Sequence, residues 1–287
     1  MNHLFLFTFI LLFLSCSENP KPIERNHPEV QVTEKIKEPK IVFNDDFENG
    51  LQDFWVAETV DTTRYSIVSD PLNAHNKVLR VRLGLDDYSN GGKRSELKIL
   101  HHGELDYKSE YSFRFMLPED FFRTDEKSGF IIIHQWHDQA DPGFNWSTQK
   151  KVTHPPVHLF IDRKEGGIYS LVFKTGLETG TMDETVTSVW KGDLKPNEWY
   201  TFSCEVLWHI YTHTGYVLPK INGENFYTSN NPAGKDPHKI YRRNMYNGIG
   251  NYPKIGLYRF SNELAEKTIY FDDFKLETEK IECSESI

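Results

Sequence analysis

Short runs of alternating apolar and polar residues recur along most of this chain and limit the folds that it can adopt. Alternation with a period of two is typical of β-strands, and no stretch shows the longer apolar period of an amphipathic helix. We expect strands at residues 65–69, 77–85, 94–100, 110–116, 130–137, 157–161, 169–174, 199–208, 215–221 and 254–260. Short helical turns are expected only near residues 118–122 and 261–266. Because aromatic residues make up 14% of the chain and can fill a large core, the sequence predicts an all-β sandwich.

The two ends of the predicted domain carry similar segments. Residues 43–47 and 271–274 both contain Asp-Asp-Phe within a strand-like run. First and last strands commonly lie side by side in a β-jelly-roll, so we predict one jelly-roll domain over residues 41–279. Two antiparallel sheets would then form a sandwich with a concave substrate groove, followed by a C-terminal tail at 280–287. Asn222-Gly223, directly after a predicted strand, is a strong signal for a β-hairpin turn.

The N-terminal segment predicts export. Residues 4–14 are almost wholly apolar but too short to cross a membrane as a stable helix, as in a signal peptide. Leu14-Ser15-Cys16 resembles the lipobox of bacterial lipoproteins, whose cysteine is lipidated. We therefore expect a signal peptide over residues 1–16, a lipid anchor on Cys16 and a location at the outer membrane or cell surface. The alternative is an ordinary cleaved signal peptide. Residues 17–40 are rich in Pro, Glu, Lys and Asn and predict a disordered tether.

Charge and cysteine content exclude some classes of protein. The net charge is −9, so the overall basic field of a nucleic-acid-binding protein is absent. A polyanionic ligand would have to be bound by local positive charge. We expect a monomer that contacts the membrane only through its lipid anchor. Cys204 and Cys283 remain in the mature chain and could pair, but a fold of this size does not depend on one disulfide.

The stretch from Phe130 to His137 carries the first candidate site. Its three isoleucines favour a buried strand, and the strand then becomes polar at Gln135 and His137. Successive side chains of a strand point to opposite faces, so Gln135 and His137 share a face about 7 Å apart. Trp136 and His134 have the opposite parity, and we expect His134 to be structural.

Two further stretches place polar residues at strand positions. Arg94 and Glu96 share one face of a predicted strand. In the segment 252–258, parity places Tyr252, Lys254, Gly256 and Tyr258 on one side. Gly256 has no side chain, so a ligand could approach the backbone closely at this position.

Three motifs occur in this order: Arg-Ser-Glu-Leu at 94–97, Gln-x-His at 135–137 and Tyr-x-Lys-x-Gly-x-Tyr at 252–258. The ordered set resembles the jelly-roll polysaccharide lyases, which include alginate lyases, glucuronan lyases and lyases of the heparin lyase I type. The resemblance covers nearly the whole domain. Trp136 and Pro253 depart from the alginate lyase pattern. These departures favour a glucuronan-like or sulfated uronate polymer over alginate as the expected substrate.

The resemblance implies β-elimination on a uronate-containing anionic polysaccharide, with no catalytic cofactor. The proton at C5 is barely acidic until donors neutralise the neighbouring carboxylate, and the resemblance gives that role to Arg94 and Gln135. A base and an acid must then flank the C5–O4 bond. His137 is suited to accept a proton, and the phenolate of Tyr258 could be stabilised by Lys254 and Arg94.

Other residues are expected to bind substrate or metal. The expected substrate-binding residues are Glu96, Lys254, Tyr252, Trp136, His158 and Lys150. Related jelly rolls often hold a structural Ca²⁺ where the first and last strands meet, and Glu48 and Asp272 offer oxygen ligands there. The alternative is that these carboxylates form hydrogen bonds at strand ends.

Two other functions fit the same fold. A noncatalytic carbohydrate-binding module or lectin could use Trp136, Trp146 and Tyr252 for stacking on sugars. A sandwich glycoside hydrolase would need paired carboxylates across the bond, and the alternating acidic strand motif of such enzymes is absent. The combination of Arg94, Gln135, His137 and Tyr258 favours a lyase over both.

Overall fold

The computed structural model describes residues 40–100, 103–123, 128–140, 142–145, 154–176, 185–228, 236–259 and 265–281. The expected signal peptide with Cys16, nearly all of the tether, Trp146, Lys150 and Cys283 lie outside these ranges. Most of the helical turn expected near 261–266 also lies outside them. Within the described ranges, no helix is long and apolar enough to cross a membrane.

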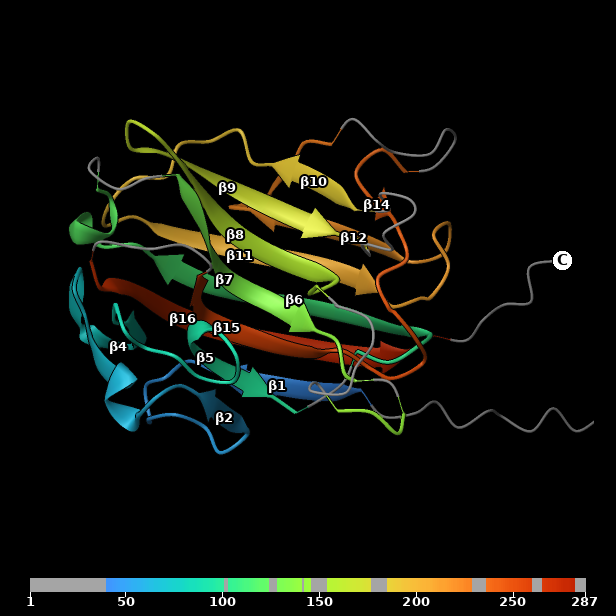
Figure 1. The fold of residues 1–287 in the computed structure, drawn as a ribbon, viewed down its shortest axis with the longest axis horizontal. Helices are drawn as coiled ribbons and strands as arrows, with labels where there is room; N and C mark the ends of the chain where they lie inside the picture. Colours follow the sequence, from blue (N-terminus) through green and yellow to red (C-terminus); the bar gives the residue numbers. More distant parts are fainter. Residues whose placement is uncertain are drawn as a thin grey trace, which may run out of the picture. The chain divides into compact units, whose positions relative to one another are not determined.

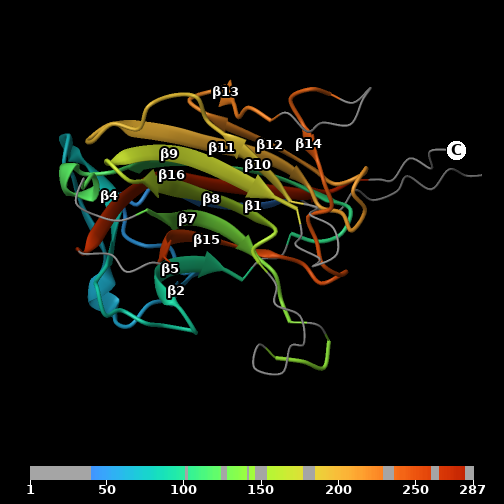
Figure 2. The same ribbon diagram turned by 45° about the horizontal axis from the view of Figure 1, so that its top comes forward.

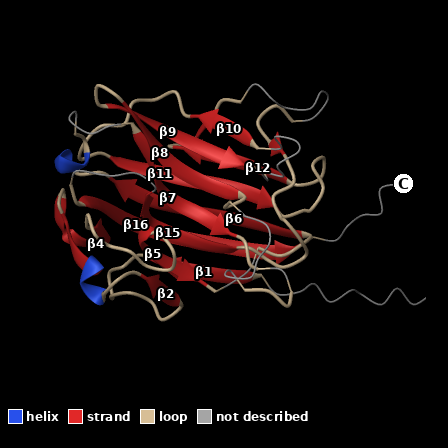
Figure 3. Cartoon of the chain, in the orientation of Figure 1, coloured by secondary structure: helices blue, strands red, loops and turns tan. Residues whose placement is uncertain are grey.

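The described residues form two antiparallel sheets with almost no helix (Figure 3). The nine-stranded sheet has the order β13 (Glu224–Asn225), β12 (Tyr216–Ile221), β11 (Trp199–Leu207), β6 (Tyr107–Met116), β16 (Lys267–Lys280), β4 (Asn73–Leu83) and β3 (Tyr65–Asp70). In addition, β1 (Ile41–Asp45) pairs with β16, and β14 (Ile240–Tyr241) pairs with β12.

The seven-stranded sheet forms the second layer. Its order is β10 (Val186–Val189), β9 (Ile168–Thr175), β8 (Val157–Lys164), β7 (Gly129–His137), β15 (Tyr252–Arg259), β5 (Lys93–Ile99) and β2 (Trp55–Glu58). Figures 1 and 2 show β9, β8, β7, β15, β5 and β2 in this order across the layer. Strands far apart in sequence therefore become neighbours, and this order brings the three polar motifs together.

Aromatic side chains fill the space between the sheets. Phe113 on β6 lies 5.2 Å from Phe202 on β11 and 5.7 Å from Phe271 on β16, measured between ring centroids. All three are fully buried, as expected from the inward parity of their strands. Burial of so much apolar surface is the main stabilising contribution to the fold.

The first and last strands pair as predicted. Strand β1 runs antiparallel to β16, with Phe43 opposite Leu276 and Asp45 opposite Phe274. The buried Asp45 carboxylate accepts hydrogen bonds from the Phe47 backbone N–H and the Trp55 indole N–H, both at 2.9 Å. The Asp45 carboxylate therefore links the end of β1 to the start of β2.

The hairpin predicted at Asn222-Gly223 is also present, between β12 and β13. Both residues adopt positive φ angles, 51° and 83°, as a two-residue hairpin turn requires. The predicted strands are found with small shifts at their ends, and the turn expected near 118–122 is the 3₁₀ helix η2 (Glu119–Phe121). The sequence analysis missed the 3₁₀ helix η1 (Thr62–Arg64) and the short strands β2, β10, β13 and β14.

Candidate active site

A β-bulge in β7 sets the direction of the central motif. Ile132 pairs with Phe160 of β8, but His134 pairs with Leu159, so Ile133 is an extra residue on β7. Ile133 and His134 both lie in the core, which reverses the parity of the strand at this point. Before the bulge Phe130 and Ile132 face outward, and after it Gln135 and His137 face outward.

His134 fixes this bulge from the core side. It is fully buried, and its Nδ1 lies 2.8 Å from the backbone carbonyl oxygen of Lys254 on β15. A carbonyl can only accept, so Nδ1 donates the proton. Burial lowers the pKa of His134 to about 3, and the imidazole is neutral at neutral pH. The prediction that His134 is structural is confirmed.

Trp136 is buried in the core and cannot bind substrate in the groove. None of its surface is exposed, and its ring lies 4.7 Å from Trp208 and 5.6 Å from Tyr111. The expectation that Trp136 contacts substrate is therefore wrong. Its parity, opposite to that of Gln135 and His137, is the physical reason.

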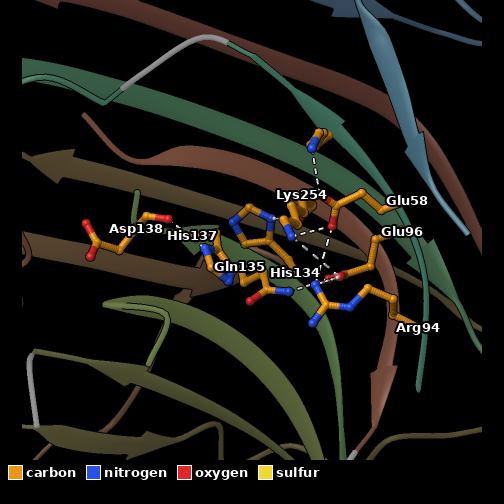
Figure 4. Close-up of polar contacts among 9 residues, drawn as sticks. Glu58, Arg94, Glu96, His134, Gln135, His137, Asp138 and Lys254 are labelled. Atoms are coloured by element: carbon orange, nitrogen blue, oxygen red, sulfur yellow. Dashed lines mark hydrogen bonds and ion pairs between the residues drawn. The ribbon is translucent and has the colours of Figure 1, made fainter. Parts of the chain in front are cut away.

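A groove of about 950 Å³ lies over the outer face of the seven-stranded sheet. Seven of the expected site residues line it: Arg94, Gln135, His137, His158, Tyr252, Lys254 and Tyr258. They come from β5, β7, β8 and β15, so three motifs distant in sequence do converge on one face. Figure 4 shows Arg94, Gln135, His137 and Lys254 close together. Lys150 lies outside the described residues.

A buried carboxylate, Glu58 on β2, organises the cations of the groove. Its oxygens lie 2.6 Å from Nζ of Lys254 and 2.6 Å from Nζ of Lys98, and Arg94 is 3.4 Å away (Figure 4). Burial opposes ionisation of Glu58, but the neighbouring ammonium groups outweigh it and lower the pKa to about 2. Glu58 is therefore ionised and holds three cations in place.

Glu96 supports the site from below and does not line the groove. It is 2% exposed, accepts a hydrogen bond from the Gln135 side-chain amide, and lies 3.3 Å from Nη1 of Arg94. These contacts orient the two residues expected to neutralise a substrate carboxylate. Glu96 is thus a positioning residue, which corrects its assignment as a substrate-binding residue.

Tyr258 lies beneath the guanidinium of Arg94, whose Cζ is 4.5 Å from the ring centroid. Burial raises the pKa of Tyr258 above its usual value of 10, although Arg94 acts in the opposite direction. The expectation of a stabilised phenolate is therefore wrong, because burial raises the pKa of Tyr258 more than the guanidinium lowers it. Tyr258 carries its proton at neutral pH.

His137 presents one ring nitrogen as an acceptor. Its Nδ1 lies 2.7 Å from the backbone carbonyl oxygen of Asp138, and the ring stacks on Tyr252 with centroids 5.5 Å apart. Because the carbonyl must accept, Nδ1 carries the proton and Nε2 keeps its lone pair. Burial, and then the charge of Lys254, lower the pKa of His137 to about 3. His137 is therefore neutral, and Nε2 can accept a proton.

Gly256 has a structural explanation that differs from the expected one. Its φ is +142°, and a Cβ at this position would collide with the Ser95 carbonyl oxygen and lie 2.7 Å from Cα of Glu96. The glycine is needed because β15 and β5 approach closely. Ligand access is not required to account for it.

Glu48 and Asp272 fit the alternative of hydrogen-bonded carboxylates better than the expected calcium site. Asp272 accepts hydrogen bonds from Asn76 at 3.0 Å and Arg114 at 3.1 Å, and a guanidinium so close disfavours a cation. Glu48 accepts a hydrogen bond from the Lys77 backbone N–H at 2.9 Å. No cluster of three or more acidic, His or Cys side chains suited to a metal occurs among the described residues.

Comparison with known proteins identifies the family. The sequence matches the polysaccharide lyase family over residues 47–275. This chain belongs to that family. The lyase also resembles the solved endo-β-1,4-glucuronan lyase from the fungus Trichoderma reesei, with a TM-score of 0.55 and 14% identity over 84% of this chain and 95% of that chain. A family 7 alginate lyase in complex with substrate gives a TM-score of 0.50 and 13% identity over 80% and 94% of the two chains.

At these identities the two structures establish the jelly-roll fold of the lyase, and the family match establishes the class of enzyme. No curated protein sequence matches this chain. The family favours the lyase over the binding module and the glycoside hydrolase considered above.

Sequence analysis of this lyase missed Glu58 and Lys98. Lys98 follows Arg94 and Glu96 at the same parity, so extending that alternation by two residues would have placed it on the groove face. Glu58 belongs to a four-residue strand with little alternation, and only the pairing of β2 with β5 brings it to the site.

Proposed function

We propose that this lyase cleaves a uronate-containing polysaccharide by β-elimination. One observation carries the proposal: the groove of an acidic protein places the cations Arg94, Lys98 and Lys254 beside a neutral histidine and a protonated tyrosine. Local positive charge attracts and orients an anionic polymer. The two uncharged groups supply the base and the acid that an elimination needs.

The protonation states assign the two roles in this proposal. Nε2 of His137 removes the C5 proton of the uronate, and the C5–H electron pair forms the C4=C5 double bond. The C4–O4 bond breaks, and the departing O4 takes the phenolic proton of Tyr258. The products are an unsaturated uronate and a free hydroxyl group, and the step leaves His137 as an imidazolium and Tyr258 as a phenolate. The proton then returns from His137 to Tyr258 through solvent, which restores both residues, so atoms and charge balance.

Charge stabilisation comes from the residues beside this pair. As C5 loses its proton, negative charge develops on the uronate carboxylate, where Arg94 and the Gln135 amide can donate hydrogen bonds. The same carboxylate would offset Lys254 and Arg94, the cations that contribute to the low pKa of His137. Substrate binding would therefore make His137 a stronger base.

The test is an assay of wild type and variants against uronate polymers, with unsaturated product followed by near-ultraviolet absorbance. Arg94→Ala and Gln135→Ala should each lower kcat by about 10²–10³-fold. Arg82→Ala is the control, because Arg82 lies on the nine-stranded sheet outside the groove. Absence of unsaturated product from wild type on alginate, glucuronan, ulvan, heparin, hyaluronan and chondroitin would reject the proposal.

We also propose that Cys16 anchors the lyase to a membrane and that residues 17–40 tether the domain. The apolar leader and the lipobox-like Leu14-Ser15-Cys16 support this location. Labelled-lipid incorporation into wild type but not into Cys16→Ala would agree with it. Equal release of both proteins into the soluble fraction would reject it.

A further inference from the structure

The groove has two chemically different halves. They emerge when the side chains that line it are grouped into rows of cross-strand partners. One row of cross-strand partners runs across five strands of the seven-stranded sheet and is polar or cationic throughout. Its members are Lys98, Lys254, Gln135, His158 and Lys174. All five line the groove.

The second row changes character between β15 and β7. It begins with Arg94 and Tyr258, and it continues with Ile132 and Phe160. Ile132 is 3% exposed, and Phe160 packs edge-on against Phe130 with ring centroids 5.7 Å apart. These three apolar side chains line the groove on the β7–β8 half. The bulge in β7 is the cause, because it turns Ile132 toward the groove and Ile133 toward the core.

A sugar bound next to the reaction centre would therefore meet different surroundings on its two sides. Neighbouring strands are ~4.8 Å apart, close to the length of one pyranose unit, so a chain crossing the strands places about one sugar over each. Over β5 and β15 the first row offers the cations Lys98 and Lys254, and the second offers Arg94 and the hydroxyl of Tyr258, which suits a uronate. Over β7 and β8 the first row offers Gln135 and His158, whereas the second row offers the apolar Ile132 and Phe160.

A charged or hydroxyl-bearing edge against Ile132 and Phe160 would lose water without gaining a hydrogen bond, which is unfavourable. A methyl group in the same place would bury apolar surface, which is favourable. We infer that the subsite over β7 and β8 takes a 6-deoxyhexose, with its methyl edge on Ile132 and Phe160. The substrate would then be a copolymer of uronate and 6-deoxyhexose and not a uronate homopolymer. This inference rests on the proposed function.

The experiment compares kcat/KM for unsaturated product on ulvan, a uronate–6-deoxyhexose copolymer, with that on glucuronan and alginate. Wild type should favour ulvan by about tenfold or more, the size expected for a matched apolar contact. Phe160→Lys should lower kcat/KM on ulvan by about tenfold, while Phe160→Leu keeps most of it. Ile168→Lys adds the same charge at an exposed position of β9 outside the groove and should have no effect.

The outcomes separate the two proposals. Equal or better cleavage of glucuronan or alginate by wild type would overturn the subsite and leave β-elimination standing. An ulvan activity that Phe160→Lys leaves unchanged, in a variant with the wild-type melting temperature, would also overturn the subsite. Absence of unsaturated product from every polymer would overturn the proposed function itself.

Discussion

Nζ of Lys254 lies 2.6 Å from Oε2 of Glu58, although the two residues are 196 positions apart in the sequence. Lys254 comes from β15 and Glu58 from β2, with β5 between these strands. The ammonium is almost fully buried, so this pair fixes one charge of the groove before any substrate arrives. A site whose charges are already positioned needs little reorganisation as charge develops on the substrate.

Glu58→Gln should destabilise the fold and impair catalysis together. Removing one partner of a buried ion pair leaves the other charge uncompensated, which typically costs about 3 kcal/mol. Lys254 and Arg94 would also lose their anchor, and we expect kcat to fall roughly tenfold to a hundredfold. Melting temperature and kcat test this, with the exposed Glu104→Gln as control. A variant that matches wild type in both measurements would show that Glu58 does not organise the site.

The same carboxylate should make stability sensitive to acid. The pKa of Glu58 is about 2 in the folded protein against an ordinary 4.5, so the unfolded chain binds the proton first. Its contribution to stability is full above about pH 4.5 and is lost as the pH falls toward 2. Denaturant unfolding between these pH values should show a smaller loss in Glu58→Gln than in wild type. Parallel curves for the two proteins would argue against this contribution.

His137 should shape the pH profile of the enzyme. Its pKa is about 3 in the free protein against an ordinary 6.5, so kcat/KM should not decline as the pH falls through 6.5. Bound uronate should raise the pKa, so the acidic limb of kcat should lie at higher pH than that of kcat/KM. Steady-state profiles on one polymer measure both limbs. A single limb near pH 6.5 in kcat/KM would mean that His137 is not held neutral as described.

Gly256→Ala should weaken the junction between β15 and β5. A Cβ would collide with the Ser95 carbonyl oxygen, and the backbone φ of +142° is unfavourable for alanine. We expect a loss of at least about 2 kcal/mol and a melting temperature lower by about 5 °C. Gly248→Ala is the matched control, since a Cβ there meets nothing within 4 Å. Similar melting temperatures for both variants would contradict the close approach of the two strands.

Period-two alternation was enough to predict the fold class and most strands, whereas the convergence of the three motifs was implied by the resemblance to jelly-roll lyases. Parity correctly placed Gln135 with His137 and Tyr252 with Lys254 and Tyr258 on the groove face. It could not predict the bulge at Ile133, because a one-residue irregularity depends on tertiary contacts such as that of His134 with β15. Ile132 therefore faces the groove unexpectedly.

The burial of individual side chains was the second feature that could not be predicted from the sequence. Tyr258 was expected beside stabilising cations, but removal from water raises its pKa more than Arg94 lowers it. Glu58 was missed because β2 is short and gains its place only through pairing with β5. The sequence thus contains the candidate groups of the site, whereas their protonation states follow from the folded environment.

Tyr258→Phe tests the central claim most directly, because it keeps the ring beneath Arg94 and removes only the proton donor. The measurement is unsaturated-product formation on the best uronate polymer, with melting temperature and polymer binding recorded for the same samples. The exposed Tyr211→Phe serves as control. We predict a folded, polymer-binding Tyr258→Phe variant with kcat lower by about 10²-fold or more. A Tyr258→Phe variant with the kcat of wild type would contradict the proposed mechanism.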